Sequence, residues 1–212
     1  MHLKIAVFVD ASFASNSDLS SQLGFMVCMI EQEHSMIEQD YRAPEQQFRS
    51  TKQEKEKHKK VHKANILHYG SQKAKRVTRS VLAAELYAMT LGFDIAYTIK
   101  AAMDEIKAAM DEMMEKPLPL AVMTDSRSLY DAMVTLNSTT EKRLLIDLRV
   151  LRDSYEKREI TEIMWIPSGD NPADALTKST PNAAGAMRRL MDRNEVAIVP
   201  KGWVERKCEC KG

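Results

Sequence analysis

Cysteine is scarce in this chain, which has three cysteines among 212 residues. Cys28, Cys208 and Cys210 are too few and too unevenly spaced to form a disulfide framework, so we expect an intracellular protein, cytoplasmic or alternatively nuclear. Long apolar runs are also missing, since none approaches the roughly 18 residues that span a bilayer. The N-terminal segment lacks the basic start and small-residue cleavage site of a signal peptide. We therefore expect no membrane segment.

Net charge is small as well. Lysine and arginine total 31, and aspartate and glutamate total 30, which gives a formal charge of +1 at pH 7. Binding of nucleic acid through bulk positive charge is therefore excluded, and any such contact must come from local basic patches. Hydrophobic residues make up 44% of the chain, which is enough for a sizeable core. The length fits one domain with an elaboration, or at most two small domains.

Hydrophobic periodicity predicts strands first, and then helices that alternate with strands. The run 3–11 is apolar on both faces, as in a central strand. Strands are predicted over 3–11, 23–30, 65–69, 118–125 and 159–166. Helices are predicted over 77–115, 126–136, 141–157 and 182–192, with a helical turn over 173–178. This order indicates an α/β fold with a central mixed sheet of five strands flanked by helices.

One domain is expected to span 1–195. Within it, the stretch 31–63 is polar and rich in Gln, Glu and Lys, which is typical of a solvated insertion. The residues 196–212 are expected to form a C-terminal tail.

A tandem repeat lies in the helix predicted over 77–115. The heptapeptide Ile-Lys-Ala-Ala-Met-Asp-Glu occurs at 99–105 and again at 106–112. An unbroken helix of this length would measure about 58 Å, so its end should project from a small domain or break. Its apolar stripe has coiled-coil spacing over two heptads, too few for a convincing coiled coil. We expect at most weak self-association through 99–114. The stripe consists of Ile99, Met103, Ile106, Met110, Met113 and Met114.

Two aspartates end predicted strands. Asp10 follows the run 3–9, and Asp125 follows the run 118–124. If these strands are parallel neighbours, both carboxylates lie at one edge of the sheet, where open α/β sheets bind ligands. The alternative is that each aspartate is an ordinary turn residue at the end of a strand.

Glu85 lies on the buried stripe of a predicted helix, four residues from Val81 and from Met89. A buried carboxylate without a partner is strongly disfavoured, and a metal ion or a cation would resolve the cost. The alternative is a core ion pair with Arg79 or Lys75.

Asp174 is the fourth carboxylate of interest. Asn171 resembles a helix N-cap, which places Asp174 in the first helical turn, where the helix dipole also favours a carboxylate. Taken together, three or four carboxylates from strand ends and helices are the hard oxygen ligands that magnesium prefers. Two such ions activate water for phosphodiester hydrolysis.

A basic cluster precedes the helix that carries Glu85. It lies just before a helix N-terminus, which is a natural phosphate site. The alternative is a solvated basic face. The cluster consists of Lys73, Lys75, Arg76 and Arg79.

Four motifs follow one another along the chain. They are Val-Phe-Val-Asp-Ala-Ser-Phe-Ala, Lys-Arg-Val-Thr-Arg-Ser-Val-Leu-Ala-Ala-Glu-Leu-Tyr-Ala, Met-Thr-Asp-Ser-Arg-Ser-Leu-Tyr-Asp and Trp-Ile-Pro-Ser-Gly-Asp-Asn-Pro-Ala-Asp-Ala-Leu-Thr-Lys. In this order they resemble the ribonuclease H domain that ends the pol polyprotein of copia-type retrotransposons. The resemblance covers about 4–30 and 64–192. It implies the ribonuclease H fold and hydrolysis of the RNA strand of RNA–DNA hybrids.

The resemblance also implies roles for single residues. The catalytic and metal-binding set falls on Asp10, Glu85, Asp125 and Asp174, with two Mg²⁺ ions, or Mn²⁺ as a substitute. Besides the basic cluster, Ser12, Ser126 and Arg127 are expected to contact nucleic acid. The partners implied are an RNA–DNA hybrid and the reverse transcriptase portion of a pol polyprotein.

Some features depart from the family. Many ribonucleases H carry a histidine in the loop before the last aspartate, whereas 167–173 contains none, and the stretch 31–63 is longer than a hairpin needs. One alternative is a catalytically silent nucleic-acid-binding or interaction module with the same fold. Another is a transposase or integrase nuclease of related fold, although the order Asp, Glu, Asp, Asp fits ribonuclease H better.

A zinc site is a weaker hypothesis. His58 and His62 are four residues apart, and Cys208 and Cys210 are two apart. This spacing of the cysteines is poor for zinc, and the two pairs are far apart in sequence. Solvated side chains are the preferred interpretation.

Overall fold

The computed structural model describes residues 2–32, 60–110, 117–135, 141–180 and 183–206. A mixed sheet organises them, with the strand order β6-β3-β2-β1-β4-β5-β7. Strands β1, β4 and β5 are parallel, and the other pairings are antiparallel. The strands are β1 (His2–Ser12), β2 (Gln22–Gln32), β3 (Lys60–Lys73), β4 (Leu120–Thr124), β5 (Glu162–Trp165), β6 (Glu195–Ile198) and β7 (Gly202–Glu205).

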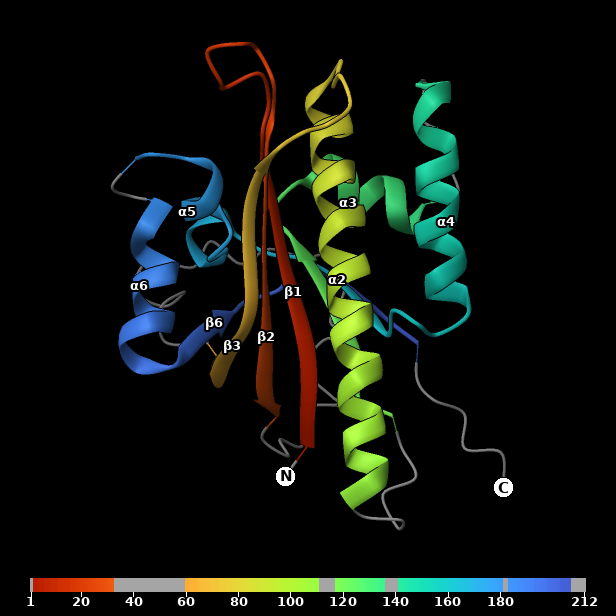
Figure 1. The fold of residues 1–212 in the computed structure, drawn as a ribbon, viewed down its shortest axis with the longest axis vertical. Helices are drawn as coiled ribbons and strands as arrows, with labels where there is room; N and C mark the ends of the chain where they lie inside the picture. Colours follow the sequence, from red (N-terminus) through yellow and green to blue (C-terminus); the bar gives the residue numbers. More distant parts are fainter. Residues whose placement is uncertain (1, 33–59, 111–116, 136–140, 181–182, 207–212) are drawn as a thin grey trace, which may run out of the picture.

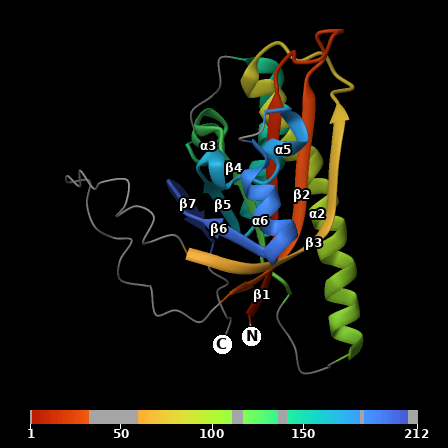
Figure 2. The same cartoon turned by 90° about the vertical axis from the view of Figure 1, so that its left-hand side faces the viewer.

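Helices cover both faces of the sheet. Figure 1 shows α2, α3 and α4 on one side of the strands and α5 and α6 on the other. Figure 2 looks onto the face that carries α5 and α6. The helices are α2 (Val81–Met110), α3 (Arg127–Val134), α4 (Leu145–Glu156), α5 (Asp174–Thr177) and α6 (Ala184–Arg193), with short 3₁₀ turns η2 (Lys142–Leu144) and η3 (Ser168–Asp170). The predicted α/β class is therefore confirmed. No helix among the described residues is long and apolar enough to cross a membrane.

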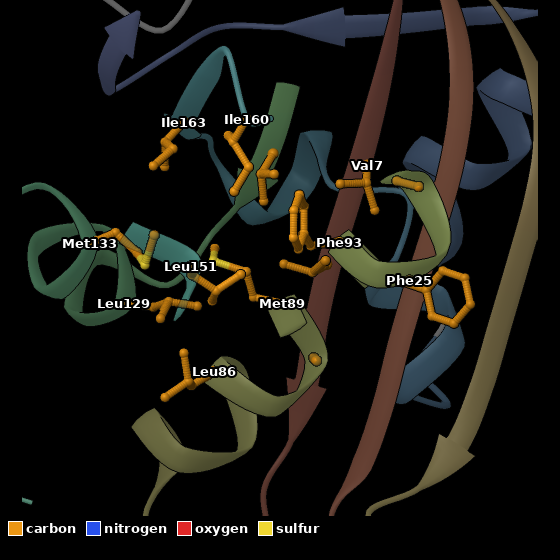
Figure 3. Close-up of a cluster of buried hydrophobic side chains, with 14 of the residues drawn as sticks. Val7, Phe25, Leu86, Met89, Phe93, Leu129, Met133, Leu151, Ile160 and Ile163 are labelled. Carbon is orange, nitrogen blue, oxygen red and sulfur yellow. The ribbon is translucent and has the colours of Figure 1, made fainter. Parts of the chain in front are cut away.

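Strand β1 is the centre of the core. Every residue from Ile5 to Val9 is fully buried, because the strand has helices on both faces. Alternate side chains enter two separate cores. Val7 and Val9 pack with α2, α3 and α4, and Figure 3 shows this larger cluster. Ala6 and Phe8 pack on the opposite face with residues of α6. The apolar run on both faces of 3–11 predicted this central position.

Among the described residues the sheet has seven strands, whereas five were predicted. The two additional strands, β6 and β7, lie at opposite edges, where β6 pairs with the start of β3 and β7 pairs with β5. They come from the end of the predicted domain and from the stretch 196–212, which was expected to be a tail. Each has four residues, too short for a clear hydrophobic period. Most of the predicted insertion 31–63 lies outside the described residues.

The two copies of the heptad have different surroundings in α2. Ile99 and Met103 from the first copy pack against the larger core, whereas Ile106 and Met110 from the second are 55% and 83% exposed. The end of α2 extends past the strands in Figure 1. The prediction that the end of this helix projects from the domain is confirmed as far as Met110. Met113 and Met114 lie outside the described residues.

Equivalent substitutions in the two copies should therefore differ in effect. Ile99→Asp should lower the free energy of unfolding by about 2 kcal/mol or more, because it removes a packed apolar side chain. Ile106→Asp should change it by less than about 1 kcal/mol and should weaken any self-association. Urea unfolding and light scattering measure the two effects. Equal destabilisation by both variants would show that the second copy also belongs to the core.

Candidate metal centre

The carboxyl ends of β1 and β4 meet at the centre of the sheet. Their parallel pairing runs as far as Val9 and Thr124, so Asp10 and Asp125 follow at the same level. The prediction that Asp10 ends its strand is wrong, because β1 continues to Ser12 through its pairing with β2. Asp10 is 1% exposed, and Asp125 is half-buried.

A third carboxylate reaches this position from the opposite end of the chain. Asp174 is the first residue of α5 and is 8% exposed. Carboxylate oxygens of Asp10, Asp125 and Asp174 all lie within 4.8 Å of one another. The structure thus brings together three of the four carboxylates that the sequence singled out.

Asn171 fastens the segment before α5 to both strands. Its Nδ2 donates to the Val9 carbonyl oxygen at 2.9 Å and to Asp125 Oδ1 at 3.4 Å, and its Oδ1 accepts from the Ala173 amide at 3.1 Å. Asn171 was expected to be the N-cap of a helix that includes 173. Because α5 begins only at Asp174, the Asn171 side chain instead stabilises the turn before α5 and orients Asp125.

Two further residues of α5 and its end contact Asp10. Thr177 Oγ1 donates a hydrogen bond to Asp10 Oδ2. Lys178 Nζ lies 3.3 Å from Asp10 Oδ1 and also pairs with Asp174. The sequence analysis missed both residues. Their spacing was the available signal, since positions three and four residues after Asp174 lie on the same face of a helix.

Glu85 approaches the same centre from α2. It is 6% exposed, and its Oε2 has no hydrogen-bond partner among the residues that the structure describes. Burial, together with the charges of Asp10 and Asp125, raises the pKa of Glu85 to about 9. The alternative ion pair with Arg79 or Lys75 does not form within the part of the chain that the structure describes. The predicted burial of Glu85 on the stripe of its helix is confirmed.

The pKa values of the neighbouring groups Asp10 and Lys178 are shifted as well. Burial raises the pKa of Asp10 to about 7, although the Thr177 hydrogen bond opposes this shift; the charge of Asp125 adds to it. Burial opposes the charged form of Lys178, but its hydrogen bond to Asp174 and the charge of Asp10 raise its pKa above the usual value. Crowded acids that retain protons near neutral pH mark a site short of positive charge.

The donor set fits a hard divalent cation. All the oxygens are carboxylates, and the unpartnered Oε2 of Glu85 adds a further acceptor. Such oxygens suit Mg²⁺ or Mn²⁺ better than a soft metal. For the zinc hypothesis, His58, Cys208 and Cys210 lie outside the described residues.

The predicted basic cluster is exposed and lies between β3 and α2. Two of its residues form ion pairs within the protein: Lys73 pairs with Asp18 at 2.9 Å, and Arg76 pairs with Asp147 at 3.4 Å. Lys75 and Arg79 form no ion pair within the described residues. These two therefore have the greater freedom to contact another molecule.

Three other predicted contact residues lie near the strand ends. Ser12 is the last residue of β1. Ser126 caps α3, because its Oγ accepts from the Leu129 amide at 3.4 Å. Arg127 is exposed and lies 3.5 Å from Asp131.

Glu85→Gln should stabilise the metal-free protein above about pH 5. The pKa of Glu85 is about 9 in the folded state, against its usual 4.5, so the folded state binds more protons between these values. Stability is then greatest below pH 4.5 and falls as the pH rises towards 9. Gln removes this loss. Urea unfolding with a chelator at pH 5, 7 and 9 measures it, with the exposed Glu105→Gln on the same helix as control. A variant less stable than the parent would instead indicate a structural ion pair.

No protein-family model matches the chain, and a search among curated proteins finds no match. Solved structures do match. The N-terminal RNase H domain of Rv2228c from Mycobacterium tuberculosis, solved as a fusion with maltose-binding protein, is 18% identical, with 82% of this chain and 95% of that chain covered and a TM-score of 0.47. LC11-RNase H1 in complex with an RNA/DNA hybrid is 15% identical, with 82% and 93% covered and a TM-score of 0.48. The RNase H domain of PFV is 14% identical, with 92% and 93% covered and a TM-score of 0.43.

Proposed function

We propose that this protein is a ribonuclease H, a metal-dependent endonuclease that hydrolyses the RNA strand of RNA–DNA hybrids. The observation that carries the proposal is the cluster of Asp10, Asp125 and Asp174 at the carboxyl ends of β1 and β4. The four ordered sequence motifs support it, since they contribute these residues and Glu85. They also support an origin in the pol polyprotein of a copia-type retrotransposon, where a reverse transcriptase portion would be a partner.

Each residue of the centre has a definable role in this reaction. Asp10, Glu85, Asp125 and Asp174 would hold two Mg²⁺ ions, or Mn²⁺ in their place. Bound divalent ions activate a water and neutralise charge on the phosphate oxygens. Two neutral side chains orient the carboxylates beforehand, since Asn171 holds Asp125 and Thr177 holds Asp10.

Lys178 acts on the metal-free state. Its ammonium group offsets the repulsion between Asp10 and Asp174, both of which it contacts. The same contact occupies one oxygen of each carboxylate. Lys178 must therefore release at least one of these oxygens before a metal can use both, so it stabilises the empty centre at the expense of metal affinity.

A second candidate function is a catalytically silent nucleic-acid-binding or interaction module. The position of Lys178 favours it, because an ammonium group among the carboxylates can serve as a permanent replacement for a metal. The two functions differ in one measurable property. Only a metal-dependent enzyme requires that Mg²⁺ bind the native state and raise its melting temperature.

Asp10→Asn and Asp125→Asn should each lower hybrid cleavage by at least about 100-fold, since even the outer partners of metal ligands contribute about 10- to 100-fold. A labelled RNA–DNA hybrid with Mg²⁺ or Mn²⁺ measures the rate, and duplex DNA should not be cut. Asp153→Asn on α4, which removes an exposed carboxylate paired with Arg149, is the matched control. Full activity in either cluster variant contradicts the assignment. No cleavage and no Mg²⁺-induced stabilisation in the parent would indicate the silent module.

Lys75 and Arg79 should hold phosphates without recognising bases. Replacing both with Ala should weaken hybrid binding to a similar extent for different sequences. It should also reduce the slope of log K against log salt by about 1.8, since each phosphate contact contributes about 0.9. Fluorescence anisotropy at several salt concentrations measures the slope. The control replaces Arg188 and Arg193, which are equally exposed but lie on α6 across the sheet. An unchanged slope in the Lys75/Arg79 variant refutes the contact.

A further inference from the structure

Trp165 connects the candidate metal centre to the edge of the sheet. It is the last residue of β5 and is half-buried. Its Nε1 donates to the backbone carbonyl oxygen of Asp125 at 3.1 Å, and its own carbonyl oxygen accepts from the Lys201 amide at 2.7 Å. One residue therefore bonds directly both to the chain at Asp125 and to the start of β7.

Two cations share the ring of Trp165. The Arg127 Cζ lies 5.4 Å from the ring centroid, and the Lys201 Nζ lies 5.2 Å from it. Each cation is attracted to the aromatic ring, but their like charges repel each other. Arg127 has only an exposed ion pair with Asp131, and Lys201 pairs with no carboxylate in the described part of the chain. An anion that contacts both cations would offset this repulsion.

The fold holds Lys201 in position. Gly202 pairs with Trp165 in the ladder of β5 and β7. A Cβ built at Gly202 would lie 2.7 Å from Tyr130 Cε1, so a side chain at this position would displace the Tyr130 ring that packs beside Trp165. A cation whose backbone is already fixed loses less freedom when it binds an anion.

We propose that Arg127 and Lys201, placed by Trp165, form a second phosphate-binding site for the nucleic-acid strand that is cut at the carboxylate cluster. This inference rests on the proposed function and deepens it. The occupant is a backbone phosphate, because arginine and lysine are the usual hydrogen-bond donors to phosphate. The hydrogen bond from Trp165 to the Asp125 carbonyl oxygen links the two cations to the centre. Lys201 lies beyond 64–192, so the motifs that indicate the reaction do not include it.

Lys201→Ala should weaken hybrid binding and reduce its salt dependence. Loss of one phosphate contact should lower the salt slope by about 0.9, which corresponds to about an eightfold weaker complex at 0.1 M salt. Lys201→Arg should retain both properties. Anisotropy with a labelled hybrid, measured with a chelator so that no cleavage occurs, gives the constants. Lys157→Ala, at an exposed lysine after α4, is the matched control, and melting temperatures verify that each variant folds.

Tryptophan fluorescence gives a local measurement. The chain has two tryptophans, so Trp203→Phe leaves Trp165 as the only one. Titration with the hybrid should change the Trp165 emission to saturation, and Lys201→Ala should reduce this change. Inorganic phosphate at equal concentration should have little effect, because it lacks the contacts that the strand makes elsewhere. An equal response to inorganic phosphate would overturn the proposal in favour of a small-anion site.

The two proposals fail in different ways. If the parent cuts the hybrid but Lys201→Ala leaves the binding constant, the salt slope and the Trp165 emission unchanged, the second phosphate site is refuted while the nuclease stands. If the hybrid binds with the expected dependence on Lys201 but is not cut, the nuclease is refuted while the phosphate site stands.

Discussion

Repulsion between carboxylates at the ends of β1 and β4 is the constraint on which this centre depends. The parallel pairing of the two strands places Asp10 and Asp125 side by side, and the packing of α2 adds Glu85 from above the sheet. Burial and the charge of Asp125 raise the pKa of Asp10 and of Glu85, and the repulsion between these groups opposes folding. The segment 171–178 supplies the compensating groups, which are an amide, a hydroxyl and an ammonium group. The last helical turn before α6 is therefore as important to the centre as the strands.

That compensation requires α5 to lie close to the sheet, and a glycine makes this possible. Gly24 of β2 pairs with Asp10. A Cβ at Gly24 would lie 2.7 Å from Thr177 Cγ2 and 3.0 Å from Leu176 Cβ. A larger residue would push α5 outwards and with it both groups that contact Asp10. The need to neutralise Asp10 on β1 therefore constrains position 24 on β2, although Gly24 has no reactive side chain.

Local patterns predicted the parts of the structure that local physics determines. An apolar run on both faces indicated the central β1, and spacing by three and four residues indicated the burial of Glu85. Pairings between distant residues left no such pattern. Lys4 and Glu162 form a buried ion pair at 3.1 Å across 158 residues, and nothing around either residue signals it. Similarly, β6 and β7 are defined by their partner strands rather than by their own four residues. Lys178 is intermediate, since its helical spacing from Asp174 was visible but its contact with Asp10 was not.

Charge balance links Lys178 to the number of metal ions that the centre can hold. Three ionised aspartates and one ammonium group leave two negative charges, which a single divalent cation neutralises. Two divalent cations would be neutralised by four negative charges, which Asp10, Asp125, Asp174 and an ionised Glu85 would supply only if the Lys178 ammonium group lay outside the cluster. On the proposed function, binding of a second ion would therefore favour ionisation of Glu85 on α2 and displacement of Lys178 at the end of α5.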